Sequence, residues 1–219
     1  MCYSAKDSII AYIIGCISNI YLFTNSKNTD EKILSLFLLF VSHMQLFDYI
    51  FWKNKECNKT NKNITKIAII FNHLQPIILY LLLKLFNNET NMGCDIIFYI
   101  FLIIIILYTI NIWPNKKCTD KEITCCSLPL KEIKNNTIIK WDWNHRKYAG
   151  IVYLIFLISL VVSSLQLKNI NIMFAFANIF TFLISTKIPN LNRSFGRLWC
   201  FIASLFTTLY LIYSRLFKG

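Results

Sequence analysis

Seven long apolar stretches run through the chain, and they restrict its fold more than any other feature of the sequence. Each approaches or exceeds the length of a helix that crosses a bilayer core of about 30 Å. They take up most of the 219 residues, of which 56% are hydrophobic, so no soluble domain of ordinary size remains. The sequence therefore predicts an all-α integral membrane protein, one domain over 1–219 built as a seven-helix transmembrane bundle. The predicted spans are Ser8–Thr24, Ile33–Trp52, Lys66–Phe86, Ile96–Trp113, Tyr148–Leu167, Ile170–Ile188 and Phe195–Ser214.

Basic residues are distributed unevenly between the two sides of these spans. Most of the 23 lysines and arginines fall on the side of the N-terminus. Because cytoplasmic loops of membrane proteins carry an excess of Lys and Arg, we expect a cytoplasmic N-terminus and a C-terminus on the opposite side. The net charge of +12 then reflects a basic face beside anionic lipid headgroups. The expected partner is therefore the lipid bilayer and not nucleic acid.

The spans also allow a grouping of three, one and three helices, in which the nearly featureless span Ile96–Trp113 links two triplets. The third and seventh spans show a weak similarity to each other. Parallel repeats of this type occur in transporters of small solutes.

Eight cysteines raise the question of disulfides and metal binding. On the predicted topology, six of them face the cytoplasm, where thiols stay reduced: Cys2, Cys57, Cys118, Cys125, Cys126 and Cys200. Four residues could in principle hold a metal, namely Cys118, Cys125, Cys126 and His145. Their C-x6-C-C pattern lacks the paired spacing of structural zinc modules. The sequence therefore predicts reduced thiols and no metal site.

The longest predicted loop covers 114–147 on the cytoplasmic side. Its stretch T-I-I-K-W-D-W-N-H, 137–145, alternates and is rich in β-branched residues, which favours a short hairpin against the membrane face. Trp141 and Trp143 are expected to be interfacial anchors, or else part of a lid over the end of the bundle.

The second span carries polar residues that a bilayer would normally exclude. At about 100° per residue, Gln45, Asp48 and Trp52 fall within roughly 60° of one another on a helix. An ionisable group inside a membrane is costly, so its presence there favours a functional role. The sequence therefore predicts that this face borders a polar pocket.

The third span supplies a second set of polar residues at a similar depth. At 1.5 Å per residue, Asn72, His73 and Gln75 lie about 9 to 14 Å from its cytoplasmic end, while Asp48 lies about 6 Å deep. Pro76 removes a backbone hydrogen bond there. We expect these residues to meet the second span in one pocket, although a membrane histidine is as often simply hydrogen-bonded to a neighbouring helix.

The seventh span begins with Arg197 and Trp199 at the depth of Asp48. A buried carboxylate needs a partner, and Arg197 is the candidate cation for Asp48. The alternative is that Arg197 extends to the membrane interface.

Short motifs resemble a family of small multi-pass membrane proteins that begin M-C-x-S-A and have no established activity. The resemblance rests on the opening M-C-Y-S-A-x-x-S, on Gln45-x-x-Asp48 followed by Trp52, on Gln75-Pro76, and on Leu198-Trp199-Cys200-Phe201. Relatives often carry Glu at the position of Asp48, and the loop from Cys118 to His145 departs from the pattern. The resemblance implies one shared site, formed by Cys2, Gln45, Asp48, Gln75 and Trp199, and supplies no substrate.

Three classes of function fit these residues. The first is a transporter or channel for a small polar solute or ion, with Asp48 as the ion or proton group. The second is a membrane-embedded enzyme acting on a lipid-like substrate, with Cys2 as nucleophile or metal ligand and His73 or Asp48 as acid and base. The third is a structural protein whose polar residues hold helices together. The sequence identifies no cofactor, and it leaves assembly of several copies open.

Overall fold

The computed structural model describes residues 4–87, 90–112, 126–131, 137–140, 148–168, 170–187 and 195–217. Within these ranges the chain forms seven α-helices and one two-stranded sheet. The helices are α1 (Ala5–Asn25), α2 (Thr29–Lys53), α3 (Lys59–Asn87), α4 (Met92–Ile112), α5 (Ala149–Ser164), α6 (Asn171–Lys187) and α7 (Phe195–Phe217). The strands are β1 (Leu128–Lys131) and β2 (Thr137–Lys140).

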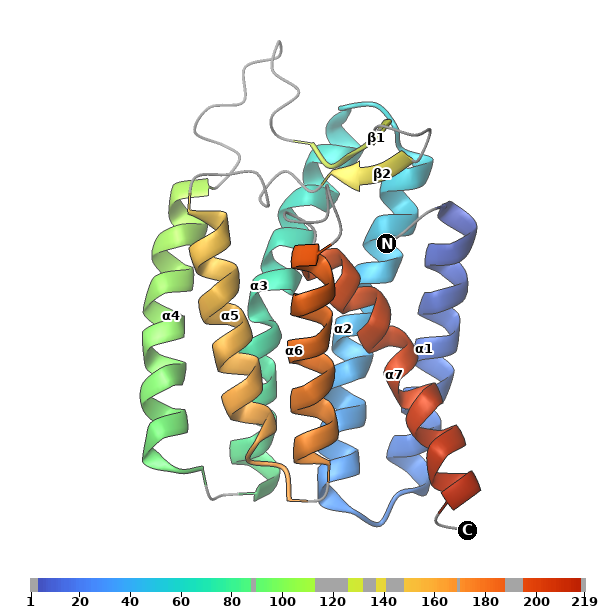
Figure 1. Ribbon diagram of the computed structural model, residues 1–219. Coiled ribbons are helices and arrows are strands. Elements are labelled where there is room, and N and C mark those ends of the chain that lie inside the picture. The colour runs from blue at the N-terminus through green and yellow to red at the C-terminus, as the bar shows by residue number, and fades with distance from the viewer. Residues whose placement is uncertain are drawn as a thin grey trace.

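Among the described residues, five helices are long and apolar enough to cross a membrane: α1, α2, α3, α4 and α7. Helices α5 and α6 are shorter, and the 16 residues of α5 extend about 24 Å. Both run alongside the longer helices in the same bundle (Figure 1). The predicted all-α, multi-pass membrane architecture is therefore found. The side of the membrane that each terminus faces, and the grouping of the helices as three, one and three, stay predictions.

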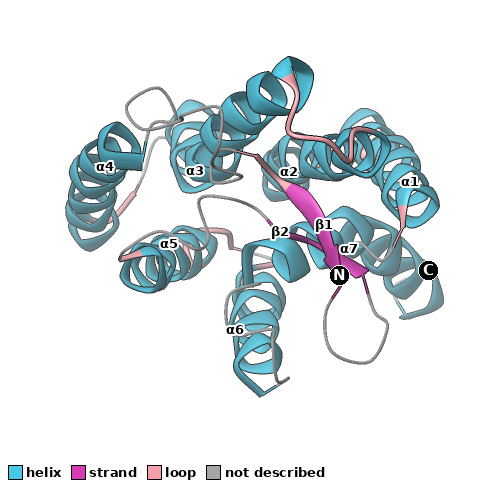
Figure 2. Cartoon of the chain, turned by 90° about the horizontal axis from the view of Figure 1, so that it is seen from above, coloured by secondary structure: helices cyan, strands magenta, loops and turns pink. Residues whose placement is uncertain are grey.

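The helices stand in two rows, with α4, α3, α2 and α1 in one row and α5, α6 and α7 in the other (Figure 2). The N-terminus and the hairpin lie at one end of the bundle, and the C-terminus lies at the other end (Figure 1). Aliphatic and aromatic side chains fill the interior between the rows. Phe174 contacts Phe37, Trp199 and Phe206, with ring centroids 5.4–5.9 Å apart.

At Gly15, α1 packs closely against both α2 and α7. A Cβ atom at Gly15 would lie 2.6 Å from Ser42 Oγ on α2 and 2.9 Å from the Ser204 carbonyl oxygen on α7. Helices in membranes associate through such small residues because their backbones can then approach closely. About one turn further along α1, two hydrogen bonds join it to α7: Thr207 Oγ1 donates to Asn19 Oδ1 at 2.6 Å, and Ser18 Oγ and Thr208 Oγ1 lie 2.7 Å apart.

The outer surface of the bundle is apolar, as a lipid-facing surface must be. On α4, Phe101 and Ile105 are buried, whereas Ile103, Ile106 and Ile110 are exposed. Contiguous exposed apolar surface of this kind is unusual for a soluble monomer. The pattern is typical of a helix that faces lipid.

A hairpin covers the end of the bundle from which α2 emerges. Strands β1 and β2 pair antiparallel, with Leu128 opposite Lys140 and Lys131 opposite Thr137, and they lie across α2 and α7 in the view along the bundle (Figure 2). The sequence indicated a hairpin over 137–145. In the structure, Thr137–Lys140 of that stretch forms a strand whose partner precedes it in the chain, and 141–145, with Trp141 and Trp143, lie outside the described residues.

A disulfide joins Cys57, in the loop between α2 and α3, to Cys126, immediately before the hairpin. The prediction that these two cysteines are reduced is therefore wrong. The fold brings their Cα atoms to 5.5 Å, which lies within the range that a disulfide requires. It also removes Cys126 from the candidate metal ligands, because its sulfur is already bonded.

Buried hydrogen bonds reinforce the attachment of the hairpin to α3. Asn61 Nδ2 donates to the Ser127 carbonyl oxygen at 2.9 Å, and the Ser127 N–H donates back to Asn61 Oδ1 at 3.1 Å. Thr65 Oγ1 lies 3.3 Å from Ser127 Oγ, and all three residues are fully buried. The segment that leads into the hairpin is thus held both covalently and by a polar clasp.

Candidate functional site

The polar face of α2 points into the bundle. Gln45 and Asp48 are completely buried, and Trp52 is 9% exposed. The three residues predicted to share a face therefore do so, in the half of the bundle nearer the hairpin.

Gln75 connects α3 to α7 through two side-chain hydrogen bonds. Trp199 Nε1 donates to Gln75 Oε1 at 3.0 Å, and Gln75 Nε2 donates to Cys200 Sγ at 3.5 Å. All three residues are fully buried. The structure thus brings Gln75 and Trp199 together and adds Cys200. The motif Leu198-Trp199-Cys200-Phe201 was the available signal for that cysteine.

Asn72 connects α3 to α5 but keeps unused acceptors. Its Nδ2 donates to the Tyr153 hydroxyl at 2.8 Å, while its Oδ1 is buried without a hydrogen-bond partner among the described residues. Pro76 lies four residues later inside α3 and has no N–H, so the backbone carbonyl of Asn72 receives no helical hydrogen bond from it. Sequence reasoning missed Tyr153, because a tyrosine near the end of a span is usually an interfacial anchor.

His73 is the most unusual residue of the group. It is 3% exposed, and its ring meets Tyr108 of α4 edge-on, with centroids 5.6 Å apart and an interplanar angle of 77°. In the described part of the chain, neither Nδ1 nor Nε2 has a hydrogen-bond partner. The described residues therefore do not give His73 the hydrogen bond to a neighbouring helix that was considered as the alternative.

Trp52 Nε1 on α2 and Asn178 Oδ1 on α6 are also buried without a partner in the described ranges. Burying a polar group without a hydrogen bond is unfavourable, and native proteins rarely do so without a reason. Several such atoms within one bundle favour a polar interior that accepts a small hydrogen-bonding species.

Other predicted site residues fall outside the described part of the chain. Cys2 lies there, as do Cys118, Cys125 and His145. Arg197 lies in the first turn of α7, but its side chain is not among those described. The Asp48–Arg197 ion pair and the participation of Cys2 therefore stay predictions.

The described part of the site has groups that can bind a small polar molecule or ion, but it offers little for covalent catalysis. The sulfur of Cys200 is fully buried and accepts a hydrogen bond from Gln75, so it is not presented as an accessible nucleophile. The amide, imidazole and indole groups can donate and accept hydrogen bonds, and Asp48 can supply a charge.

The chain was compared with protein-family models, curated proteins and solved structures, and no match was found in any of them. The resemblance to the M-C-x-S-A family therefore stays a prediction. What can be concluded about this protein rests on its own residues and their geometry.

Proposed function

We propose that this protein carries a small polar solute or ion across a membrane, and that the polar residues of α2 and α3 form its binding site. One observation carries the proposal: His73, Asn72 and Trp52 are buried in the bundle with hydrogen-bonding atoms that no described residue satisfies. A site of this kind is expected for a solute that exchanges its water shell for protein groups.

The contacts separate the polar residues into two classes. Gln75, Trp199 and Cys200 satisfy one another, which is what residues that hold helices together do. Asn72 and His73 retain free atoms on the same helix. The structural function considered from the sequence thus accounts for the first class and not for the second.

Asp48 is the natural coupling group for transport. A carboxylate that is completely buried among apolar helices is costly in a membrane, and such residues commonly mark ion and proton pathways. In the proposed mechanism, binding of a proton or cation at Asp48 accompanies entry of the solute beside Asn72 and His73.

The hairpin gives the site a cover at one end. Both strands contact α2, and the disulfide and the clasp at Ser127 hold the segment before β1 in place. We infer that solute passes this end only when the hairpin moves.

The test is flux into liposomes that contain the purified protein. Stopped-flow light scattering follows neutral polar solutes such as urea, glycerol and sugars, and trapped dyes follow protons and cations. We expect flux of at least one class above protein-free liposomes, and we expect Asp48→Asn to abolish or uncouple it. Glu56→Gln is the matched control, since it removes an exposed carboxylate from the adjacent loop and should leave flux unchanged.

Two outcomes would overturn the proposal. One is a folded, reconstituted protein that passes none of these solutes. The other is a flux that Asp48→Asn and Glu56→Gln reduce equally, because a general charge effect would then explain it.

A further inference from the structure

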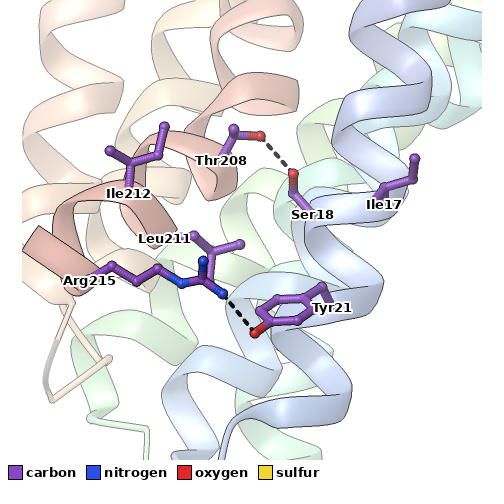
Figure 3. A pocket seen from close by; sticks show the side chains of 7 residues that line it. All are labelled: Ile17, Ser18, Tyr21, Thr208, Leu211, Ile212 and Arg215. Atoms are coloured by element: carbon purple, nitrogen blue, oxygen red, sulfur yellow. Dashed lines mark hydrogen bonds between the residues drawn. The ribbon is translucent and has the colours of Figure 1, made fainter. Parts of the chain in front are cut away.

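A groove lies between the C-terminal halves of α1 and α7 (Figure 3), which run to the end of the bundle opposite the hairpin (Figure 1). Its volume is about 280 Å³, and it is lined by Ile17, Ser18, Tyr21, Thr208, Leu211, Ile212 and Arg215. Pockets for drug-sized ligands measure about 300–1,000 Å³, so this groove takes part of a longer molecule. Ile17 is 64% exposed and Ile212 is 52% exposed, which means that the groove opens to the outside of the bundle.

The walls of the groove are apolar, and its deeper polar groups are already paired. Ser18 and Thr208 carry no charge, and their hydroxyl groups already hydrogen-bond to each other at 2.7 Å. Ile17, Leu211 and Ile212 supply the remaining surface. In a bilayer, this surface suits a hydrocarbon chain.

One end of the groove is cationic. Arg215 Nη2 donates to the Tyr21 hydroxyl oxygen at 3.2 Å, and Arg215 forms no salt bridge with any described residue. A guanidinium has five N–H donors, and the Tyr21 hydroxyl still has its own proton to donate. Figure 3 shows the two side chains reaching toward each other across the mouth of the groove.

Glu31, an acidic residue that contacts α7, is already hydrogen-bonded to other residues. Both carboxylate oxygens of Glu31 accept hydrogen bonds, one from Tyr210 and one from Ser26. The positive charge of Arg215 is therefore available for an external anion.

The two ends of the groove lie at the depths of the two parts of a phospholipid. Arg215 is near the end of the apolar segment Leu198–Leu216, and Tyr21 is near the end of Ala5–Asn25, which is the depth of headgroups. Thr208 lies seven residues back along α7, about 10 Å deeper into the hydrocarbon.

We propose that this groove is a binding site for an anionic phospholipid. Its phosphate pairs with Arg215 and Tyr21, and one acyl chain lies along Ile17, Leu211 and Ile212. Arginine favours phosphate because its planar donors match two phosphate oxygens, and basic pockets between membrane helices hold anionic headgroups in this way. The site is separate from the polar interior proposed for transport.

Native mass spectrometry of the purified protein tests the proposal by counting bound phosphatidylglycerol and phosphatidylcholine in mixed micelles. We expect wild-type protein to prefer phosphatidylglycerol. Arg215→Gln should weaken that binding about tenfold, equivalent to about 1.4 kcal/mol. Lys27→Gln is the control, because it removes an exposed positive charge on the same side of the bundle but outside the groove, and it should leave binding within about twofold of wild type.

A second pair of variants separates the two parts of the site. Tyr21→Phe keeps the ring and the arginine, and it should weaken binding less than Arg215→Gln does. Ile212→Trp fills the groove while keeping the charge, and it should reduce binding of both phospholipids. The melting temperature of each variant is measured by circular dichroism, and a variant whose value shifts by more than a few degrees is left out. If Tyr21→Phe and Ile212→Trp are left out, the test rests on Arg215→Gln, which lies at an exposed position.

Three results would overturn the proposal. Equal losses in Arg215→Gln and Lys27→Gln would indicate general charge attraction. Unchanged phosphatidylglycerol binding by Arg215→Gln would show that Arg215 does not contact the headgroup. Conversion of a dimer to a monomer by Ile212→Trp, with lipid binding unchanged, would show that a second copy of the chain occupies the groove.

Discussion

Among the side chains of the described bundle, His73 is the one whose contacts fit a binding role best and a packing role least. Its two ring nitrogens are buried without partners in the described ranges, so its polarity contributes nothing to the packing seen there. Leaving a buried polar atom unsatisfied costs about 1–3 kcal/mol. Stability lost in this way is typical of functional sites, where activity takes precedence over stability.

We therefore predict that His73→Phe leaves the melting temperature unchanged or raises it, and that it lowers solute flux. Phenylalanine keeps the edge contact with Tyr108 without the buried nitrogens. Thermal unfolding in detergent and flux in liposomes, measured on one preparation, check both parts. A clear drop in melting temperature would mean that His73 serves packing.

Gln75 should behave in the opposite way. Replacing it with leucine leaves the buried indole N–H of Trp199 without its acceptor, so we expect a loss of about 1–3 kcal/mol in unfolding free energy. Trp199→Phe removes the orphaned donor but leaves a cavity in the core, so we expect the double variant to lose less stability than the sum of the two single variants. Thermal unfolding of the single and double variants forms a double-mutant cycle, and strictly additive losses would contradict the inferred bond.

At the scale of the helices, the meeting of α1, α2 and α7 depends on the absence of a side chain at Gly15. We predict that Gly15→Ala destabilises the protein by about 1–3 kcal/mol, because its Cβ would meet Ser42 Oγ and the Ser204 carbonyl. Gly150→Ala is the control, since a Cβ there meets nothing within 4 Å, and it should be neutral or slightly stabilising. Similar melting temperatures for the two variants would disprove the close packing.

The hairpin is an element whose attachment can be broken chemically. Cys57 and Cys126 are 69 positions apart in the sequence. A disulfide that closes a loop of this length contributes about 2–4 kcal/mol to the free energy of unfolding. We predict that Cys57→Ser increases hydrogen exchange in 126–140 and lowers the melting temperature, and that dithiothreitol has the same effect on wild-type protein only. Alkylation of both cysteines in unreduced wild-type protein would contradict the bond.

The sequence made different parts of this site visible to different degrees. The polar face at Gln45, Asp48 and Trp52 follows from helical periodicity, which a membrane helix cannot avoid. Tyr153 and the pair Cys57–Cys126 could not be found in this way, because they depend on which helices become neighbours. The first strand of the hairpin, L-P-L-K, has only four residues and contains a proline, and a proline argues against a strand.

For the whole molecule, two cues to orientation disagree. The excess of Lys and Arg places the N-terminus and the hairpin end in the cytoplasm, whereas disulfides are rare there. The charge cue sums over many residues and the disulfide is a single bond, so we predict a cytoplasmic N-terminus and a bond that cellular reductants can open. Labelling of a tag at the N-terminus in intact and permeabilised cells checks the prediction, and labelling of intact cells would contradict it.

The disulfide also has a consequence for how the chain is assembled. Helices α3 and α4 both lie between Cys57 and Cys126 in the sequence, so the bond closes a covalent ring that passes down through the membrane and back. The ring cannot close until the chain has been synthesised through both helices and its two ends have met, so the bond marks a chain in which Cys57 and Cys126 have come together across this helix pair. A protease that cut the chain once between α3 and α4 would leave two pieces that remain one molecule until a reductant separated them.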